Sequence, residues 1–366
     1  MTTKRLTVYI GRFSPFHKGH AETIELALRN SDRVLVIIGS AHRPRDIKNP
    51  WTFAERALMI KQWYDAKGFT TELAIVPQRD HPYSNQRWLS DIQYHVTREI
   101  SNMGDTDVYL TGSDRDESTF YLKEFPNYKL DLVAEDREIS QYLSATSIRD
   151  IYLGGWLNHR QLTIKESEEL NRVFVPETTA KFLSSFRETS DFATLMLEYQ
   201  FQHEHDRRWQ VAPHVPTFQT VDAVVIQTGH VLLVKRRNAP GKGLWALPGG
   251  YLNPREWMLD GAVRELIEET KIDVPKPVIY GSLKDDHVFE APDRSNRGRV
   301  ITRAFLFKLP EFVVDGKVKL PKVKGDDDAE KAKWFPLSEV MEMSDVLFED
   351  HYDIIQTMIS RLKEKR

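Results

Sequence analysis

Two histidines near the N-terminus lie three residues apart, within the stretch YIGRFSPFHKGH at residues 9–20. At the first turn of a helix, His17 and His20 would lie on one side, where both imidazoles can donate hydrogen bonds to phosphate oxygens. Gly19 leaves room between them, and Gly11 lets the backbone approach a ligand. Backbone N–H groups at a helix start add donors and a positive dipole end. The stretch therefore predicts a phosphate cradle, and the alternative is a turn with two exposed histidines.

A second stretch, LSATSIRD at residues 143–150, carries hydroxyl groups and an arginine. Ser144 and Thr146 lie at a predicted helix start, and Arg149 follows one turn later. These groups make a second candidate phosphate site. The alternative is an ordinary capped helix with an exposed arginine.

Glutamates crowd a third stretch, GYLNPREWMLDGAVRELIEETKI at residues 250–272. Glu265, Glu268 and Glu269 follow i, i+3, i+4 spacing, so on a helix they share one face and repel one another unless cations bind. A metal there would hold a diphosphate and activate a water to attack phosphorus. The alternative is a solvated acidic helix.

Strands and helices are predicted to alternate up to about residue 150, and these elements must position the first two stretches. Short β-branched runs alternate with segments of helical apolar spacing, which predicts an α/β fold with a doubly wound parallel sheet and helices on both faces. The histidine stretch follows the first strand, at the end where such sheets bind ligands. Strands are expected at 6–10, 33–39, 71–77, 107–113 and 128–136, and helices at 20–30, 52–66 and 87–101.

The pattern changes at about residue 218 to hairpin-like strands, with a turn at residues 228–230. Helices are expected around 256–270 and at 350–365, so this part is interpreted as α+β. Between the two parts, residues 176–212 look helical at first and then lose periodicity. The predicted organisation is a domain at 1–175, a helical connector at 176–212 that packs on one domain or both, and a domain at 213–366.

Composition narrows the classes of function. The 366 residues suit two domains, each with its own core. Lysine and arginine number 51 against 54 acidic residues, a net charge of −3, so no global positive field points to nucleic acid. Without cysteine, a metal must sit on carboxylates, histidines or substrate phosphates, which favours magnesium. No apolar stretch suits a signal peptide or membrane span, so we expect a cytoplasmic protein with small-molecule partners; homo-oligomers are left open.

Together the two phosphate-binding stretches resemble the nucleotidylyltransferase superfamily, which has an H-x-G-H motif after the first strand and a serine, threonine and arginine motif late in the domain. Residues 39–56, 85–92 and 111–126 are further similar to archaeal-type nicotinamide mononucleotide (NMN) adenylyltransferases, which make NAD from ATP and NMN. This resemblance implies that Trp88 stacks on the nicotinamide ring, with Asn85 near the base. The alternative for Trp88 is a core aromatic. The implied ATP and NMN site comprises Gly11, Arg12, Phe13, Gly19, Arg45, Asn85, Trp88, Gly112, Asp114, Ser144 and Thr146, with Arg12 and Arg45 as candidate phosphate contacts.

That reaction needs no general base, because the attacking NMN phosphate is already ionised at neutral pH. The barrier falls when two anions are positioned and their charge is neutralised by histidine, arginine, backbone N–H groups and magnesium. His17, His20 and Arg149 are therefore the predicted catalytic residues, and they stabilise charge rather than move protons.

The third stretch resembles the Nudix box nearly throughout. Lys271 stands where that family usually has glycine, which puts the helix cap in doubt rather than the metal site. The resemblance implies that Arg264 holds a glutamate in place, that Glu256 helps complete the metal shell or orients its ligands, and that Glu269 is catalytic. The implied metal ligands are Glu265, Glu268 and Glu269. Magnesium, with manganese as the alternative, is expected in both domains, and no organic cofactor is expected.

Residues 236–250 resemble the strand and loop that lead into the box in Nudix hydrolases generally, and residues 285–305 and 325–339 look like the ADP-ribose pyrophosphatase branch. The implied reaction converts ADP-ribose and water to AMP and ribose 5-phosphate. Implied substrate contacts are Arg236, Gly249, Gly250, Arg297 and Arg299, with Asp327 or Asp328 as a further candidate. The alternative for the loop around Arg297 is a mobile, solvated loop.

The leading hypothesis is therefore a bifunctional enzyme of NAD metabolism. One alternative keeps both folds but changes the substrates to another mononucleotide and another nucleoside diphosphate derivative. A second alternative is a Nudix domain that senses ADP-ribose and regulates the first domain. The second alternative is disfavoured because sensors typically lose the catalytic glutamates, which this sequence retains.

Overall fold

A computed structural model describes residues 3–112, 121, 123–132, 144–154, 156–157, 160–325 and 328–364. The chain forms two compact units, Met1–Tyr199 and Gln200–Arg366. Residues of the predicted connector belong to both units. Within the described ranges, no helix has the length and apolar character needed to cross a membrane.

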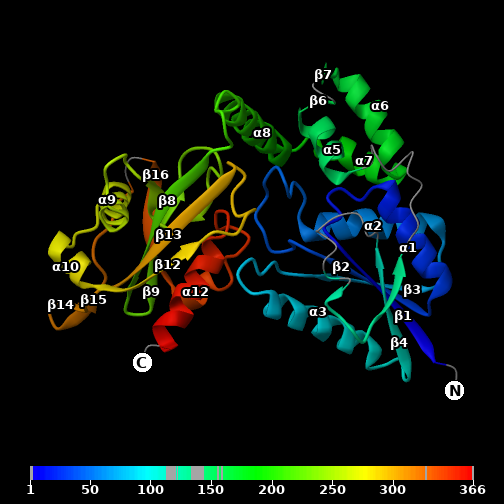
Figure 1. Ribbon diagram of the computed structural model, residues 1–366, viewed down its shortest axis with the longest axis horizontal. Coiled ribbons are helices and arrows are strands. Elements are labelled where there is room, and N and C mark those ends of the chain that lie inside the picture. Colours follow the sequence, from blue (N-terminus) through cyan, green and yellow to red (C-terminus); the bar gives the residue numbers. More distant parts are fainter. Residues whose placement is uncertain are drawn as a thin grey trace. The chain divides into compact units, whose positions relative to one another are not determined.

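The described residues of the first unit contain a five-stranded parallel sheet in the order β3-β2-β1-β4-β5 (Figure 1). Its strands are β1 (Lys4–Gly11), β2 (Arg33–Ile38), β3 (Glu72–Pro77), β4 (Thr106–Gly112) and β5 (Lys129–Leu132). The chain adds strands first on one side of β1 and then on the other, so the C-terminal end of β1 is a switch point where such sheets bind ligands. The predicted doubly wound sheet is confirmed.

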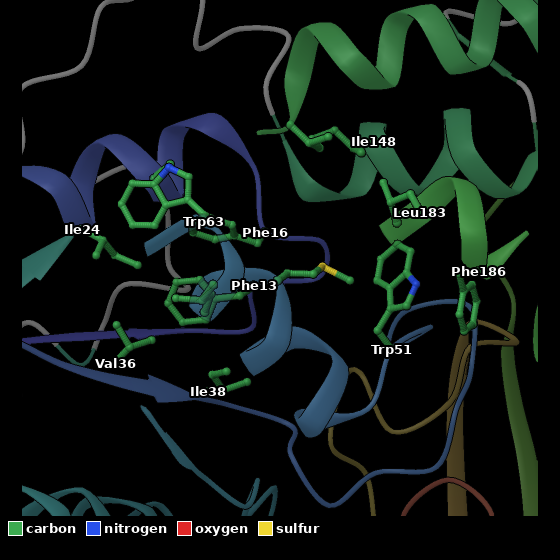
Figure 2. Close-up of a cluster of buried hydrophobic side chains, with 14 of the residues drawn as sticks. Phe13, Phe16, Ile24, Val36, Ile38, Trp51, Trp63, Ile148, Leu183 and Phe186 are labelled. Atoms are coloured by element: carbon green, nitrogen blue, oxygen red, sulfur yellow. The ribbon is translucent and has the colours of Figure 1, made fainter. Parts of the chain in front are cut away.

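Helices cover both faces of this sheet: α1 (Lys18–Asn30), α2 (Phe53–Lys67) and α3 (Asn85–Ile100). Alternate residues of β2 serve opposite faces. Val36 and Ile38 belong to a core cluster with residues of α1 and α2, including Trp63 (Figure 2), whereas Leu35 and Ile37 belong to a cluster with α3. Because both faces are covered, β2 is a continuous apolar run, as is typical of buried parallel strands.

The end of the first unit is largely helical. It contains α5 (Ala145–Arg149), the π-helix η2 (Asp150–Gly154), a small hairpin of β6 (Trp156–Leu157) and β7 (Arg160–Gln161), then α6 (Ile164–Phe174) and α7 (Glu177–Phe186). Helix α8 (Ser190–Trp209) begins in the first unit, and its residues from Gln200 on belong to the second. Leu183 and Phe186 of α7 join the core cluster of α1 and α2 (Figure 2). The predicted connector is helical where α7 and α8 lie, and α8 runs unbroken to Trp209 although apolar periodicity is lost along it.

The described residues of the second unit contain a seven-stranded mixed sheet, β10-β9-β8-β13-β12, with β11 paired to β8 and β16 to β9. β8 and β13 are parallel, and the other pairs are antiparallel. The strands are β8 (Thr217–Gln227), β9 (His230–Arg236), β10 (Trp245–Ala246), β11 (Gly249–Tyr251), β12 (Leu283–Phe289), β13 (Arg299–Lys308) and β16 (Ala329–Pro336). Thr228 and Gly229 both have positive φ in the predicted hairpin turn between β8 and β9.

Helix α9 (Met258–Thr270) lies on this sheet, and its buried Ala262, Val263 and Leu266 share a core cluster with residues of β8, β9 and β13. The helix ends at Lys271, which adopts the left-handed conformation with φ 45° and donates its N–H to the Ile267 carbonyl. The cap that was in doubt therefore forms without glycine. The remaining elements are α10 (Lys276–Gly281), the hairpin of β14 (Phe312–Val314) and β15 (Lys317–Lys319), α11 (Leu337–Val340) and α12 (His351–Glu364).

Candidate active sites

The two histidines cap the start of α1 reciprocally. Nδ1 of His17 accepts the backbone N–H of His20, and Nδ1 of His20 accepts that of His17, each over 3.4 Å. Because Nδ1 is the acceptor in both rings, the neutral imidazoles carry their protons on Nε2, where they can donate to an anion. The rings stack with centroids 3.5 Å apart. His17 is only 8% exposed and His20 is half-buried, so the alternative of two exposed histidines is wrong.

Phe13 shapes the loop in front of α1. It holds a left-handed backbone at φ 51° while its buried ring packs 4.8 Å from the His20 ring. A Cβ on Gly11 would lie 3.1 Å from the Phe13 ring, so a larger residue there would press on the ring. Next to Phe13, the buried Ser14 Oγ has no hydrogen-bond partner among the described residues. A buried hydroxyl of this kind normally has a partner, which a ligand in the cradle can supply.

Arg149 joins the two predicted phosphate-binding stretches. It donates from Nη1 to the Ser14 carbonyl over 2.6 Å and from Nη2 to Thr146 Oγ1 over 3.0 Å. Ser144 caps α5 by accepting the Ser147 N–H over 3.0 Å. Arg149 is 5% exposed, so the alternative of an exposed arginine is wrong. Burial, together with the nearby charge of Arg12, lowers the pKa of Arg149 to about 10. Two cations that repel each other would be stabilised by an anion between them.

A third arginine, Arg56 of α2, was missed by the sequence analysis. It is 1% exposed and donates to the carbonyl oxygens of Arg12, Gly39 and Ser40, at 2.6, 2.8 and 3.1 Å. Burial, with the charge of Arg12 adding to it and Asp80 opposing it, lowers the pKa of Arg56 to about 10. Arg56 therefore ties the loop after β1 to the loop after β2 and adds positive charge beneath the cradle. Its position in an amphipathic helix gives no signal of this role.

The side chain of Arg45, a predicted phosphate contact, is surrounded by carboxylates. Its guanidinium forms a bidentate pair with Glu55 at 2.6 and 2.8 Å and a further pair with Asp191 at 3.0 Å. Nη1 also donates to the Pro50 carbonyl. Burial lowers the pKa of Arg45, but the hydrogen bonds and charges of Glu55 and Asp191 outweigh this effect, so the pKa is raised. The described geometry therefore does not favour a phosphate contact by Arg45.

The predicted nicotinamide contacts lie at the start of α3. Asn85 is exposed at the first helical position, and the half-buried Trp88 follows one turn later on the same face. The Trp88 ring lies 6.2 Å from Tyr121, whose hydroxyl donates to the Ile10 carbonyl over 3.0 Å. Trp88 thus packs on the core and also lies beside the end of β1. Gly112 is the last residue of β4, and Asp114 lies outside the described residues.

In the second unit, Arg264 binds three glutamates. Its guanidinium contacts Glu256 at 2.7 and 2.9 Å, Glu265 at 2.8 Å and Glu268 at 2.9 Å. These carboxylates raise the pKa of Arg264, with the Glu256 hydrogen bond as the largest cause. The contact implied for Arg264 is present, and it orients three carboxylates rather than one.

Two glycines, Gly249 and Gly250, lie against the carboxylates of Glu269 and Glu265. The Gly249 N–H donates to Glu269 Oε2 over 3.0 Å, and a Cβ on Gly250 would lie 2.6 Å from Glu265 Oε1. Glu269 is 8% exposed, and burial raises its pKa to about 8. The charges of Glu265 and of the buried Asp222 contribute to this rise, and the Gly249 hydrogen bond opposes it. Asp222, on β8, was not found by sequence reasoning because the register of β8 with β11 brings it here.

The donor set fits a hard divalent cation. No group of three or more histidine, aspartate or glutamate side chains is gathered in metal-binding geometry among the described residues. Burial nevertheless raises the pKa values of both Glu265 and Glu269, and neighbouring carboxylates add to the effect. A divalent cation would relieve this repulsion, and carboxylate oxygens are the ligands that magnesium and manganese accept.

The loop at residues 290–298 is anchored. Arg294 pairs with Asp350 at 2.9 and 2.8 Å, both side chains almost fully buried, and Ser295 donates to Glu349 over 2.6 Å. The alternative of a solvated loop is therefore wrong at Arg294 and Ser295.

The predicted ADP-ribose contacts differ in their settings. Arg297 pairs with Glu349 at 3.2 Å, and Arg236 stacks 4.0 Å above Phe348. Arg299 instead donates to the Glu290 carbonyl. Asp328 accepts from Asn238 over 2.9 Å, whereas Asp327 lies outside the described residues.

Comparison with known families divides the chain in two. The cytidylyltransferase-like family model matches residues 8–151, and the NUDIX domain model matches residues 216–358.

Similar proteins match either one of these two parts or almost the whole chain. A nicotinamide/nicotinic acid mononucleotide adenylyltransferase of Acinetobacter baylyi is 33% identical over 195 residues, which are 53% of this chain and 93% of the relative. An ADP-ribose pyrophosphatase of Methanocaldococcus jannaschii is 35% identical over 136 residues, 37% of this chain and 69% of the relative. A bifunctional NMN adenylyltransferase/ADP ribose pyrophosphatase from Francisella tularensis, solved with AMP and a manganese ion, aligns with a TM-score of 0.85 at 33% identity and covers 98% of this chain and 99% of that chain.

Proposed function

Because the chain belongs to the family of bifunctional NMN adenylyltransferase/ADP-ribose pyrophosphatases, we propose that it catalyses both reactions. The first unit transfers the adenylyl group of ATP to NMN, giving NAD and pyrophosphate. The second hydrolyses ADP-ribose to AMP and ribose 5-phosphate. One observation carries the proposal: the first candidate site holds buried cations with lowered pKa values, and the second holds buried carboxylates with raised pKa values. The first suits polyphosphate anions directly, and the second suits them through a metal.

In the first unit, the residues act by binding and charge stabilisation. His17 and His20 donate from Nε2 to phosphate oxygens, and the N–H groups at the start of α1 add further donors. Arg149 adds a positive charge and orients the loop through its bond to Ser14. The NMN phosphate is already ionised, so no residue needs to remove a proton. Trp88 and Asn85 are proposed to hold the nicotinamide.

In the second unit, Glu265, Glu268 and Glu269 would hold the metal. Bound magnesium or manganese supplies charge neutralisation of the diphosphate and a more acidic water. Arg264 orients Glu265 and Glu268 through its guanidinium, while the Gly249 N–H fixes Glu269, the proposed catalytic residue. We propose magnesium as the metal of the working enzyme, and Arg236 and Arg297 as contacts to the substrate.

Separate assays of the purified chain test the two halves of the proposal. ATP with NMN should give NAD and pyrophosphate, and ADP-ribose with magnesium should give AMP and ribose 5-phosphate. Failure to form NAD would refute the first half, and failure to cleave ADP-ribose would refute the second. Cytoplasmic location, homo-oligomers and the absence of nucleic-acid partners stay predictions.

A further inference from the structure

Helix α8 carries an aromatic stripe, defined by Phe201, His205 and Trp209. The four-residue intervals place the three rings on one face of the helix. The centroids of Phe201 and His205 are 6.3 Å apart with nearly parallel planes, and those of His205 and Trp209 are 6.5 Å apart. The stripe belongs to the second unit but precedes residue 216, where the NUDIX domain match begins.

The stripe packs on Phe218 of β8. The Phe218 ring lies 5.7 Å from His205 and 5.0 Å from Trp209, the latter edge to face. Phe218 in turn lies 6.0 Å from Tyr251 of β11. The sheet register explains this last contact, because Tyr251 pairs with Thr220, which shares a face with Phe218 two residues earlier.

The same stripe holds the loop that carries Arg297. His205 Nε2 donates to the Arg297 carbonyl over 3.1 Å. Arg297 Nη1 approaches the Tyr251 hydroxyl at 3.4 Å, and its guanidinium lies 5.6 Å above the Tyr251 ring. The contacts therefore form a closed circuit: α8 contacts Phe218, Phe218 contacts Tyr251, Tyr251 contacts Arg297, and the Arg297 carbonyl accepts from His205 of α8.

Tyr251 connects this circuit to the glutamates. Its carbonyl accepts a hydrogen bond from Arg264 over 3.2 Å, and it directly follows Gly250, which lies against Glu265. The Tyr251 side chain itself is 43% exposed. An exposed aromatic ring and a guanidinium beside the carboxylates are groups that can bind the part of a nucleoside diphosphate sugar that extends beyond the metal-bound diphosphate.

We propose that His205 and Trp209 are positioning residues of the hydrolase site, which hold Tyr251 and Arg297 in place to bind a nucleoside diphosphate sugar. This inference rests on the proposed hydrolysis of ADP-ribose. The hydrolase site then includes a segment outside the NUDIX domain match. Because the segment acts on binding rather than on the attacking water, its loss should raise KM and leave kcat nearly unchanged.

Kinetics of full-length variants test this role. For His205→Ala and Trp209→Ala, the KM for ADP-ribose with magnesium should rise about ten-fold while kcat stays within about two-fold, the signature of lost binding. Arg207→Ala is the matched control, because Arg207 lies on the same helix with its side chain 67% exposed and should leave KM unchanged. His205→Gln should recover part of the affinity, since its amide can donate to the Arg297 carbonyl. Trp209→Phe should do the same by keeping an aromatic ring on Phe218.

The outcomes separate the inference from the proposed function. If the wild type hydrolyses ADP-ribose and both alanine variants keep its KM, the positioning role is refuted and the function stands. If the alanine variants lose kcat and NAD synthesis together with thermal stability, and the conservative variants do not restore KM, the stripe is only structural and the role is again refuted. If the wild type does not cleave ADP-ribose, the proposed function fails and the inference fails with it.

Discussion

At the residue scale, the two ring nitrogens of His17 have different roles, one in the stability of α1 and one in the proposed catalysis. Nδ1 of His17 caps α1, whereas Nε2 is proposed to donate to phosphate. His17→Asn retains an acceptor near the position of Nδ1 but has no group at Nε2. We expect both His17→Asn and His17→Ala to lower kcat for adenylyl transfer by about 100-fold, the effect of losing one preorganised donor. Thermal unfolding should show His17→Asn more stable than His17→Ala by about 1 kcal/mol, the worth of an N-cap.

Steady-state rates with ATP and NMN, together with thermal unfolding, measure both effects. ADP-ribose hydrolysis serves as the internal control and should not change in either variant. Unchanged turnover in His17→Asn would contradict the role of Nε2.

Arg56 provides a second residue-level prediction. Arg56→Met would leave the buried carbonyl of Ser40 and the part-buried carbonyls of Arg12 and Gly39 without this donor. An unsatisfied buried group costs about 1–3 kcal/mol, so we expect the first unit to lose about 3 kcal/mol or more of its free energy of unfolding and the KM for ATP to rise. Chemical denaturation checks the first effect. An exposed arginine such as Arg29→Met is the control, and equal stability of the two variants would refute the role of Arg56.

His351 gives a pH-dependent prediction. It is buried, and its Nδ1 accepts the Leu247 N–H over 2.8 Å. Burial lowers its pKa from 6.5 to about 3, with the charges of Arg294, Arg236 and Arg297 adding to the effect against Asp350. A lowered pKa means that the unfolded chain binds the proton first, so this stability is present above pH 6.5 and is lost as the pH falls toward 3.

His351→Asn keeps an acceptor for Leu247 and does not titrate. Its free energy of unfolding relative to the wild type should therefore improve by about 2 kcal/mol between pH 7 and pH 5. Asp222, whose pKa burial raises to about 6, has the opposite pH dependence but is present in both proteins. Urea unfolding at the two pH values measures the difference, and a constant difference would contradict a neutral buried His351.

The site residues that sequence could predict are those in linear motifs. His17, His20, Arg149 and the glutamates were predicted because their spacing alone places them on a helix face or at a helix start. Arg56 and Asp222 were not, because their surroundings come from strands and loops that are distant in sequence. Arg45 stays a prediction from the family resemblance, and in the structure its guanidinium pairs with Glu55 and Asp191.

At the element scale, the end of α9 supports a stability prediction. Lys271 adopts φ 45°, a conformation that costs a residue with Cβ about 1–2 kcal/mol and glycine almost nothing. Lys271→Gly should therefore raise the free energy of unfolding of the second unit by about 0.5–1 kcal/mol, after the entropy of the added glycine is subtracted. Thermal unfolding measures this, with Lys276→Gly at the start of α10 as a control expected to destabilise. A loss of stability in Lys271→Gly would show that the lysine side chain contributes more than its backbone strain.

The strands and helices of the first unit were predicted well, whereas residues 176–212 were predicted only as a helical connector, without the bounds of α8. The parallel strands of the first unit could be read from continuous apolar runs because both sheet faces are covered. The bounds of α8 could not be predicted, because polar residues occupy most positions of its second half and the apolar spacing is lost there. The contact partner of the stripe, Phe218, lies in another element, so the local sequence could not show that the stripe is partly buried.

At the scale of the whole molecule, the central claim is that each unit carries its own chemistry. The first candidate site has no residues in common with the second, and the two sites have opposite charge character. The Francisella structure that aligns along almost the whole chain pairs the same two folds. Independence of the two sites predicts that each can be inactivated without affecting the other.

Removing the metal is less selective for one site than an amino-acid substitution, because magnesium also binds ATP, a substrate of the first site. With ADP-ribose as substrate, chelation should abolish hydrolysis, and added magnesium or manganese should restore it. Calorimetric titration of the chain with manganese, without substrate, gives a readout that does not depend on activity. Glu265→Gln should weaken this binding, whereas Glu339→Gln on α11 should not.

The most direct test of the central claim is the Glu269→Gln variant, assayed for both reactions in one preparation. The substitution keeps the side-chain oxygen that accepts the Gly249 N–H, so the fold should be retained, and it removes the proposed catalytic carboxylate. The account predicts that ADP-ribose hydrolysis falls by at least about 1,000-fold while NAD synthesis from ATP and NMN stays at the wild-type rate. Loss of both activities in a folded variant, or hydrolysis at the wild-type rate, would contradict it.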